Sequence, residues 1–246
     1  MNDCQMEIKI SNLQKQYNGR VVLDIEELAV KKGEIVGILG NNGAGKTTLL
    51  RLALDLLKAD SGHICSRGVD VSKDEQWKTY TSAYLDTNFL IDFLTPEEYF
   101  MFISDNYGKE RSTCKKILTE FRPFMNGEIL NQKKYIRDFS SGNRQKIGII
   151  GTVLSEPEIL ILDEPFNYLD PSSQFFIRDY FFQLNKKDGA TLLISSHNLE
   201  HIIDLSTRII LLDKGKIIKD IENDKKGADD ELRHYFELYP SFIQSY

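Results

Sequence analysis

The stretch EIVGILGNNGAGKTTLLRL, residues 34–52, decides the fold. Its first part, residues 34–39, is a short apolar run that is typical of a strand buried on both faces of a parallel sheet. A glycine-rich loop follows at residues 40–47, and leucines then recur at helical spacing over residues 49–57. The sequence therefore predicts a buried strand, a tight loop and a helix in direct succession.

The loop fits the pattern G-x-x-x-x-G-K-[ST] at every fixed position. Its glycines let the backbone turn so that successive N–H groups face phosphate oxygens, and the helix N-terminus that follows also favours negative charge. We expect Lys46 to reach the β- and γ-phosphates of ATP and the Thr47 hydroxyl to bind Mg²⁺. The predicted ATP-binding residues of this segment are Gly40, Asn41, Asn42, Gly43, Ala44, Gly45, Lys46, Thr47 and Thr48.

A second motif, ILILDEP at residues 159–165, is an apolar strand that ends in two carboxylates. Next to a phosphate-binding loop, Asp163 is expected to hold Mg²⁺ through water. Glu164 is expected to orient or deprotonate the water that attacks the γ-phosphate. By itself such a strand end is more often a helix cap or a solvated turn, and the catalytic interpretation depends on the loop at residues 40–47.

The remaining pattern predicts an α/β organisation. The first 30 or so residues alternate apolar and polar side chains around Gly19, as antiparallel strands do. Strand-like runs separated by a helical segment return after residue 158, which indicates a parallel sheet covered by helices. Between them, residues 88–155 have a mostly helical pattern that starts with an N-capping sequence at Thr95.

Together these motifs resemble the nucleotide-binding subunit of an ATP-binding cassette (ABC) transporter, over residues 6–220. Residues 139–143, FSSGN, stand where that family has its L-S-G-G-Q signature, and Arg144, Gln145 and Lys146 follow them. The resemblance implies that the signature acts on the ATP of a second subunit. The signature residues are Ser140, Ser141, Gly142 and Asn143.

The same resemblance assigns further residues. Tyr17 matches the aromatic residue that stacks on adenine, and His197 matches a histidine that contacts the γ-phosphate and the catalytic carboxylate, here Glu164. The segment after the second motif resembles the loop that runs along the dimer interface, with Asn167, Leu169 and Asp170 as its residues.

Two departures from the family pattern bear on function. Where the family has a glutamine after a strand near residues 82–85, this chain has Asp86 and Thr87. That position relays the nucleotide state to the membrane partner, so the substitution puts the relay in doubt, although Asp86 could still contribute to Mg²⁺ binding. In the signature, Ser141 replaces a glycine and Asn143 replaces the glutamine.

His197 and His201 also spell H-x-x-E-H, a zinc-peptidase pattern. Two histidines four residues apart could share a helical face. However, His197 directly follows a predicted strand, and neither His63 nor His234 has a convincing setting for a third ligand. We therefore favour the nucleotide role for His197.

Composition limits the other classes of function. The chain has 246 residues, a formal net charge of −6 and a pI of about 5.4, which argues against a general nucleic-acid binder. No apolar stretch approaches the ~20 residues that span a bilayer, and the start lacks the pattern of a signal peptide. Three scattered cysteines indicate a reduced compartment.

The sequence thus predicts a P-loop NTPase core with a mainly parallel sheet, an N-terminal antiparallel β subdomain and an inserted helical subdomain. Residues 1–222 would form the ATPase domain, and residues 223–246 a short tail with a helix near 228–238. The resemblance implies an ATPase that uses ATP and Mg²⁺ and pairs with a second nucleotide-binding subunit, identical or different. The subunit would energise a separate transmembrane permease from the cytosolic face of the cell membrane without inserting into the bilayer. It would more closely resemble export-type systems.

Two other functions stay open: a soluble ABC ATPase that takes no part in transport, and a regulatory nucleotide-binding partner with weak hydrolysis. An exposed aromatic surface near residues 86–107 would favour the transporter, because a membrane subunit needs an apolar surface on which to dock. The candidates are Phe89, Phe93, Tyr99 and Phe102, most of which could equally be core residues.

Overall fold

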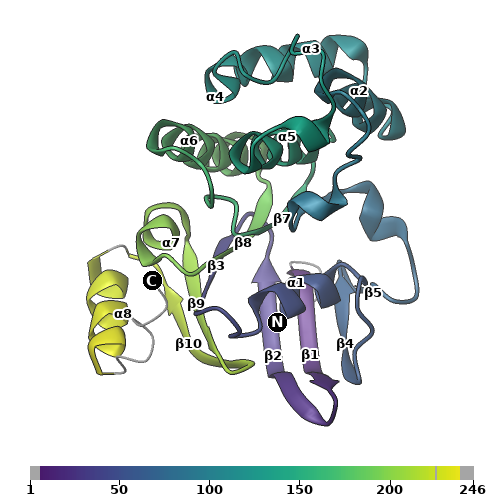
Figure 1. The fold of residues 1–246 in the computed structure, drawn as a ribbon. Coiled ribbons are helices and arrows are strands. Elements are labelled where there is room, and N and C mark those ends of the chain that lie inside the picture. Colours follow the sequence, from purple (N-terminus) through teal and green to yellow (C-terminus); the bar gives the residue numbers. More distant parts are fainter. Residues whose placement is uncertain (1–5, 225, 239–246) are drawn as a thin grey trace.

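The computed structural model describes residues 6–224 and 226–238. It has a layered α/β architecture, in which an antiparallel sheet and helix α1 lie at one end and helices α2, α3 and α4 at the other (Figure 1). A central, mainly parallel sheet lies between these two parts. The predicted fold class is confirmed.

The antiparallel sheet has the strand order β2-β1-β4-β5. Strands β1 (Met6–Tyr17) and β2 (Arg20–Lys31) form the hairpin that the alternating pattern predicts. Asn18 and Gly19 form its turn with φ angles of 50° and 76°, which are the left-handed values that a two-residue hairpin turn requires. Strands β4 (Ser61–Ser66) and β5 (Val69–Asp70) extend this sheet.

The central sheet has the order β10-β9-β3-β8-β7-β6. All its neighbouring strands pair in parallel except β10 with β9. Because the carboxyl ends of parallel strands share one edge, the residues after β3, β7 and β8 come together there. The strands are β3 (Ile35–Leu39), β6 (Thr81–Tyr84), β7 (Ile159–Asp163), β8 (Thr191–Ser196), β9 (Arg208–Asp213) and β10 (Lys216–Glu222).

Helix α1 (Lys46–Ala53) follows the loop as predicted, but it is shorter than the leucine spacing suggests. The prediction that it continues to residue 57 is wrong. Asp55 adopts a left-handed conformation with φ of 51°, which cannot continue an α-helix, and Leu56 is 49% exposed.

Helices α2–α5 form the helical lobe between β6 and β7. Thr95 caps α2 in a reciprocal capping box with Glu98, and Pro96 is the first helical residue. The helices are α2 (Pro96–Asn106), α3 (Arg111–Glu120), α4 (Arg122–Met125) and α5 (Ser141–Val153), with 3₁₀ turns at Thr87–Phe89 and Ile136–Asp138. A further 3₁₀ turn, Gln76–Thr79, precedes β6.

Three helices follow β7, and the last of them ends the described chain. They are α6 (Pro171–Asp188), α7 (Leu199–Leu205) and α8 (Lys226–Leu238). Ala228 and Leu232 of α8 are buried against the main core, so this helix packs on the body of the protein. Residues 239–246 of the predicted tail, and Cys4, lie outside the described residues.

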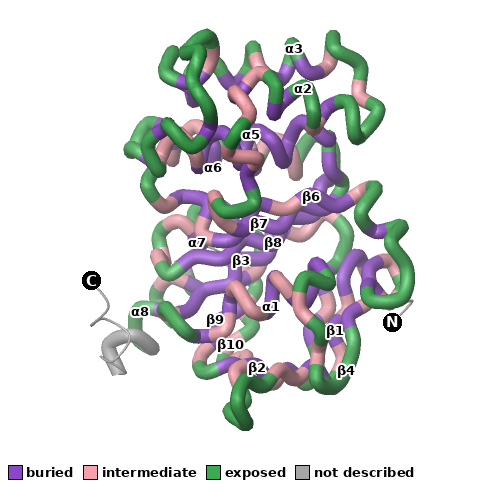
Figure 2. The backbone as a smooth tube through the Cα atoms, turned by 45° about the vertical axis from the view of Figure 1, so that its right-hand side comes forward, coloured by how far each residue is buried: buried purple, intermediate pink, exposed green. Residues whose placement is uncertain are grey.

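Strands β3, β7 and β8 of the central sheet are buried at every position, as the purple trace across the middle of Figure 2 shows. In β3, Ile35 and Leu39 belong to a core cluster shared with the helices above, whereas Val36 and Ile38 belong to a cluster shared with α1 and the antiparallel sheet. Side chains at alternate positions of β3 therefore pack on opposite faces of the sheet. Because both faces are buried, the strand is a continuous apolar run.

The aromatic candidates of the helical lobe divide into two groups. Phe89, Phe93 and Phe102 are 55%, 67% and 45% exposed, as a docking surface requires. Tyr99 is buried, because its ring fills the space above Gly151, where an added Cβ would lie 2.8 Å from the ring. None of the helices in the described part of the chain has the length and apolar character that a membrane crossing needs.

Candidate active site

The loop between β3 and α1 has the conformation that an anion site requires. Gly43 and Gly45 have φ angles of 82° and 109°, which side chains with a Cβ rarely adopt. Gly45 is the N-cap of α1 and provides no side-chain cap, so no side chain competes with a ligand for the first amides of the helix. A Cβ on Gly40 would lie 2.4 Å from the carbonyl oxygen of Leu212. The glycines of the motif are thus required by backbone angle and by close packing.

Lys46 is held inside this loop. Its side chain is 6% exposed, and its ammonium donates hydrogen bonds to the carbonyl oxygens of Gly40 at 2.6 Å and Asn41 at 3.2 Å. The same nitrogen lies 3.2 Å from Oε1 of Glu164. The predicted phosphate-binding lysine and the predicted catalytic carboxylate are therefore direct neighbours.

The carboxyl end of β7 brings the two predicted carboxylates to this loop. The Thr47 hydroxyl donates to Oδ2 of Asp163 at 2.5 Å, and the Ser195 hydroxyl donates to Oδ1. Burial raises the pKa of Asp163 above its ordinary value, and these hydrogen bonds act in the opposite direction. A carboxylate that is costly to ionise in isolation suits a position beside a cation.

The oxygens of Thr47 and Asp163 fit Mg²⁺, which prefers hard oxygen ligands from one or two carboxylates together with phosphates and water. The third predicted contributor, Asp86, lies differently. It accepts a hydrogen bond from the amide of Asn88 at 2.6 Å and pairs with Arg51 at 3.4 Å. Among the described residues, no hydrogen bond or ion pair joins Asp86 to Thr47 or Asp163. The structure thus brings together two of the three predicted metal residues.

Glu164 directly follows β7 in a strained conformation, with φ of 48°. Its amide donates to the Ser195 hydroxyl at 2.9 Å, and its backbone carbonyl accepts from Nε2 of Gln145 at 3.1 Å. Left-handed backbone at a bulky residue persists only where the surroundings enforce it, and it occurs disproportionately at functional sites. The backbone of Glu164 is fixed from two sides.

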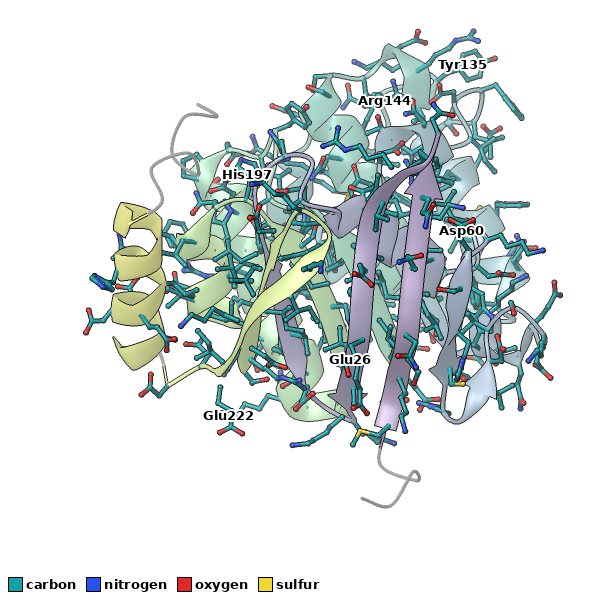
Figure 3. All side chains as sticks on the ribbon, turned by 90° about the horizontal axis from the view of Figure 1, so that it is seen from below. Glu26, Asp60, Tyr135, Arg144, His197 and Glu222 are labelled. Atoms are coloured by element: carbon teal, nitrogen blue, oxygen red, sulfur yellow. The ribbon has the colours of Figure 1, made fainter. Side chains whose placement is uncertain are left out.

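His197 follows β8 and completes the group. Its Nδ1 lies 2.9 Å from Oε2 of Glu164, as the nucleotide role predicts. His201 lies in α7 instead, where its ring packs on Phe166 with centroids 4.6 Å apart. Because His197 precedes the helix, the two histidines do not share a helical face. Figure 3 shows His197 beside the sheet and Arg144 in the helical lobe.

The predicted signature stands apart from this group. Ser140 is the N-cap of α5 and accepts a hydrogen bond from the amide of Asn143 at 3.3 Å, while the side chain of Asn143 donates to Glu128 at 3.0 Å. Ser140 and Ser141 are exposed. The helix N-terminus and its serines are therefore open to a ligand that comes from outside the chain.

The segment that resembles the dimer-interface loop contacts the signature. A Cβ on Gly142 would lie 2.6 Å from the carbonyl oxygen of Tyr168, so only glycine fits there. Tyr168 is 74% exposed with φ of 57°, and Leu169 beside it is buried. Asn167 closes a turn through its amide, which donates to the carbonyl of Glu164 at 3.2 Å.

Asp170 ends this segment as the N-cap of α6. Its carboxylate accepts hydrogen bonds from Ser172 and Ser173 and lies 3.3 Å from Nζ of Lys146. The hydrogen bonds from Ser172 and then Ser173 lower its pKa well below the ordinary value. Asp170 therefore anchors the segment within its own chain.

Tyr17 is the last residue of β1. Its ring is 45% exposed, and Nζ of Lys15 lies 5.4 Å from the ring centroid. An exposed aromatic ring beside a lysine can stack on the adenine ring of a nucleotide. The stacking of Tyr17 on adenine remains a prediction.

Sequence reasoning missed two residues that hold the site together. Ser195 bridges Asp163 and the amide of Glu164, and Gln145 joins the carbonyl of Glu164 to the hydroxyl of Tyr84, which donates at 3.0 Å. The polar end of the apolar strand at residues 191–196 was a usable signal for Ser195. The contacts of Gln145 depend on packing between distant segments and leave no local pattern.

Comparison with known proteins identifies relatives of this sequence and of this fold. The family model described as ABC transporter matches residues 23–167. An uncharacterised ABC transporter ATP-binding protein of Bacillus subtilis, YhcH, is 32% identical over 233 residues, covering 93% of this chain and 74% of its own. A solved structure of an ATP-binding subunit of an ABC transporter superposes with a TM-score of 0.82 at 26% identity, covering 96% of this chain and 99% of its own. The dimeric post-hydrolysis state of an ATP-binding cassette bound to ADP and Pi shares the fold, with a TM-score of 0.76 at 23% identity over 87% of this chain and 98% of its own.

Proposed function

The chain belongs to the ABC transporter family of ATP-binding domains, and from this we propose that it is the ATP-hydrolysing subunit that drives a separate transmembrane permease. One observation supports hydrolysis best: Glu164 lies between Lys46 and His197, at 3.2 Å and 2.9 Å, beside the Thr47–Asp163 pair. A carboxylate in this position can accept a proton from water where the γ-phosphate of ATP would be held.

The roles of the residues follow from their chemistry. The amides of residues 40–48 and the ammonium of Lys46 bind the phosphates, and the exposed ring of Tyr17 stacks on the adenine. Thr47 and Asp163 hold Mg²⁺, which neutralises charge on the β- and γ-phosphates. Glu164 orients and deprotonates the attacking water, and His197 fixes the Glu164 carboxylate and contacts the γ-phosphate.

A second nucleotide-binding subunit, identical or different, completes each site. Ser140 and Ser141 are exposed at the N-terminus of α5, and that helix end favours a phosphate. We assign residues 140–143 to the ATP of the partner, and the segment of Asn167, Leu169 and Asp170 to the interface between the subunits. ATP then acts as the ligand that closes the dimer.

A groove where the helical lobe meets β6 and the segment after α1 supports a membrane partner. It has a volume of about 280 Å³ and is lined by Trp77, Leu85, Asp86, Phe89, Leu90 and Tyr99. Phe93 and Phe102 are also strongly exposed on this lobe. Clusters of exposed apolar side chains mark interaction sites. We propose that a cytosolic segment of the permease docks there, which places the chain on the cytosolic face of the membrane.

The finer parts of the proposal rest on the family resemblance. Residues 1–222 act as the ATPase domain, residues 223–246 form a short tail, and the transporter exports its substrate. Reconstitution with the permease in inside-out vesicles tests direction: ATP added outside drives substrate into the vesicle if the system exports, and loss of loaded substrate from the vesicle would contradict export.

Dimerisation tests the proposed function. The Glu164→Gln variant keeps the binding residues but lacks the base, so with Mg²⁺ and ATP it should form a stable dimer, measured by size-exclusion chromatography with light scattering. ADP should leave it monomeric. A variant that turns over ATP at the wild-type rate would overturn the catalytic assignment.

A further inference from the structure

The departure at Asp86 creates a contact between two parts of the molecule. Asp86 follows β6 in the segment, Asp86–Thr87, where the family has glutamine, and its Oδ2 lies 3.4 Å from Nη2 of Arg51. Arg51 is in the last turn of α1, the helix that begins with Lys46 and Thr47. Through Oδ1, Asp86 also caps the 3₁₀ turn at Thr87–Phe89. The carboxylate thus ties the start of the helical lobe to the helix that carries the phosphate-binding residues.

A second arginine holds the same segment from the other side. Nη2 of Arg144 donates to the carbonyl of Thr87 at 3.2 Å and to Oδ1 of Asp92 at 2.8 Å. Arg144 lies in the first turns of α5, the helix capped by Ser140. Residues 86–92 are therefore held between an arginine of the ATPase core and an arginine of the signature helix.

Helix α5 is also coupled to the catalytic base. Gln145, the neighbour of Arg144, donates to the carbonyl of Glu164 at 3.1 Å and accepts from the Tyr84 hydroxyl at 3.0 Å. Tyr84 is the last residue of β6, two positions before Asp86. A displacement of residues 86–92 would thus act on α1, on α5 and on the backbone of Glu164.

We propose that Arg51 and Asp86 are a positioning ion pair that takes over the coupling role of the missing glutamine. The pair fixes the helical lobe relative to α1. It thereby positions the N-terminus of the signature helix, α5, against the nucleotide that is bound to the partner subunit. Asp86 acts here through Arg51 and not as a metal ligand. The inference rests on the proposed ATPase function and adds a residue pair to it.

The exposure of the pair sets its expected strength. The side chains of Arg51 and Asp86 are 38% and 33% exposed, so solvent and salt screen their attraction. Partly exposed ion pairs of this kind contribute little, and we expect each single variant to change the turnover rate by about two- to fivefold.

The test is a double-mutant cycle in the full-length chain with Arg51→Gln, Asp86→Asn and both together. Each single variant should lower kcat, and the double variant should be no slower than the slower single variant, because the two residues act as one unit. KM for ATP, the Mg²⁺ concentration for half-maximal activity and Tm should stay at wild-type values. The reversed pair, Arg51→Glu with Asp86→Arg, should restore kcat. Lys216→Gln is the matched control, because it removes a surface pair with Asp24 at the same 3.4 Å distance.

The single tryptophan of the chain gives a readout that does not depend on hydrolysis. Trp77 is 7% exposed and lines the groove with Asp86 and Phe89. In a Glu164→Gln background, Mg²⁺ and ATP should change the Trp77 emission, and Arg51→Gln or Asp86→Asn should reduce that change at saturating nucleotide. If neither the wild type nor any variant hydrolysed ATP, the proposed ATPase function would be wrong. The change in Trp77 emission on ATP binding would still test whether Arg51 and Asp86 position the helical lobe.

Three results would overturn the positioning role. Additive losses in the double variant would show independent residues. A shift in Mg²⁺ dependence with Asp86→Asn but not with Arg51→Gln would make Asp86 a metal ligand. A lowered Tm with unchanged kcat and unchanged Trp77 response would show that the pair only stabilises the fold.

Discussion

Lys46 and Glu164 form an ion pair inside the phosphate-binding loop, with Nζ of the lysine 3.2 Å from Oε1 of the glutamate. The other carboxylate oxygen, Oε2, lies 2.9 Å from Nδ1 of His197. The side chain of Glu164 is 19% exposed, so solvent screens these contacts only in part. The carboxylate is thus held between two basic groups, one from the glycine-rich loop and one from the end of β8.

The first prediction concerns this carboxylate and nucleotide affinity. Glu164→Gln removes a negative charge beside the phosphates and releases Lys46 from its ion pair, so ATP should bind more tightly than in the wild type. We expect about a three- to tenfold lower Kd, equivalent to roughly 1 kcal/mol. Titration with a fluorescent ATP analogue measures it. An affinity below that of the wild type would contradict this view of the pair.

Lys46→Ala should have the opposite effect. The ammonium makes charge-assisted contacts, each of which contributes about 1.5–3 kcal/mol, so ATP affinity should fall by roughly ten- to a hundredfold or more. Lys73→Ala, which changes a lysine with a 77% exposed side chain, is the control and should bind as the wild type does. Equal affinities of the two variants would exclude Lys46 from the phosphate site.

Gly142→Ala should impair hydrolysis without abolishing nucleotide binding. The added methyl group would meet the carbonyl of Tyr168 at 2.6 Å and would force the segment at residues 167–170 to move. ATP-dependent dimerisation and kcat should both fall, while monomer affinity for ATP stays the same. Tyr168→Ala keeps the carbonyl but removes the exposed ring, and so separates the backbone clash from any contact of the ring with a partner.

Much of the site could be predicted because its parts are local in sequence. The loop at residues 40–47 combines fixed spacing with a preceding buried strand, β3. Asp163 ends β7 and Glu164 follows it, and β7 lies in the same parallel part of the sheet, separated from β3 by β8. Since parallel strands align their carboxyl ends, the motifs meet at one edge of the sheet. The capping sequence at Thr95 predicted a helix start because it, too, is a short motif of neighbouring residues.

Other features depend on packing that a single sequence does not encode locally. From its place in the sequence, Tyr99 is as good a candidate for an exposed docking surface as its aromatic neighbours. In the structure its ring is instead packed against Gly151. Helix α1 ends early because Asp55 adopts left-handed backbone, although the leucines continue in helical register. The partner of Asp86 was not predictable, because Arg51 meets it only when α1 packs beside the end of β6.

Stability should depend on pH through Asp170. Hydrogen bonds from Ser172 and Ser173 lower the pKa of this carboxyl below its ordinary value of 3.8 in the folded state. The ionised form is therefore favoured by folding, so its contribution to stability is present above pH 3.8 and is lost as the pH falls below it. Asp170→Ala removes a helix cap as well, and at pH 7 it should lower Tm by about 2–4 °C.

Thermal unfolding between pH 7 and pH 3 checks this prediction. The difference in Tm between the wild type and Asp170→Ala should shrink below pH 3.8. Asp170→Asn can still cap the helix but does not titrate, so it should be less destabilised and should lack this part of the pH dependence. A constant difference across the whole range would mean that the hydrogen bonds do not act through ionisation.

The docking surface gives the last prediction. Phe93 is 67% exposed in the turn that precedes α2, and Phe175 is 61% exposed on α6. Phe93→Asp should leave the ATPase activity of the isolated chain unchanged, because Phe93 is not one of the residues assigned to ATP or to the signature. It should weaken assembly with the permease, measured by co-purification of the two subunits, and should reduce transport. Phe175→Asp makes the same chemical change on α6, away from the turn that holds Phe93, and should assemble normally. If both variants assembled as the wild type does, the permease would have to contact another part of the chain, and the aromatic surface at residues 89–102 would lose its proposed role.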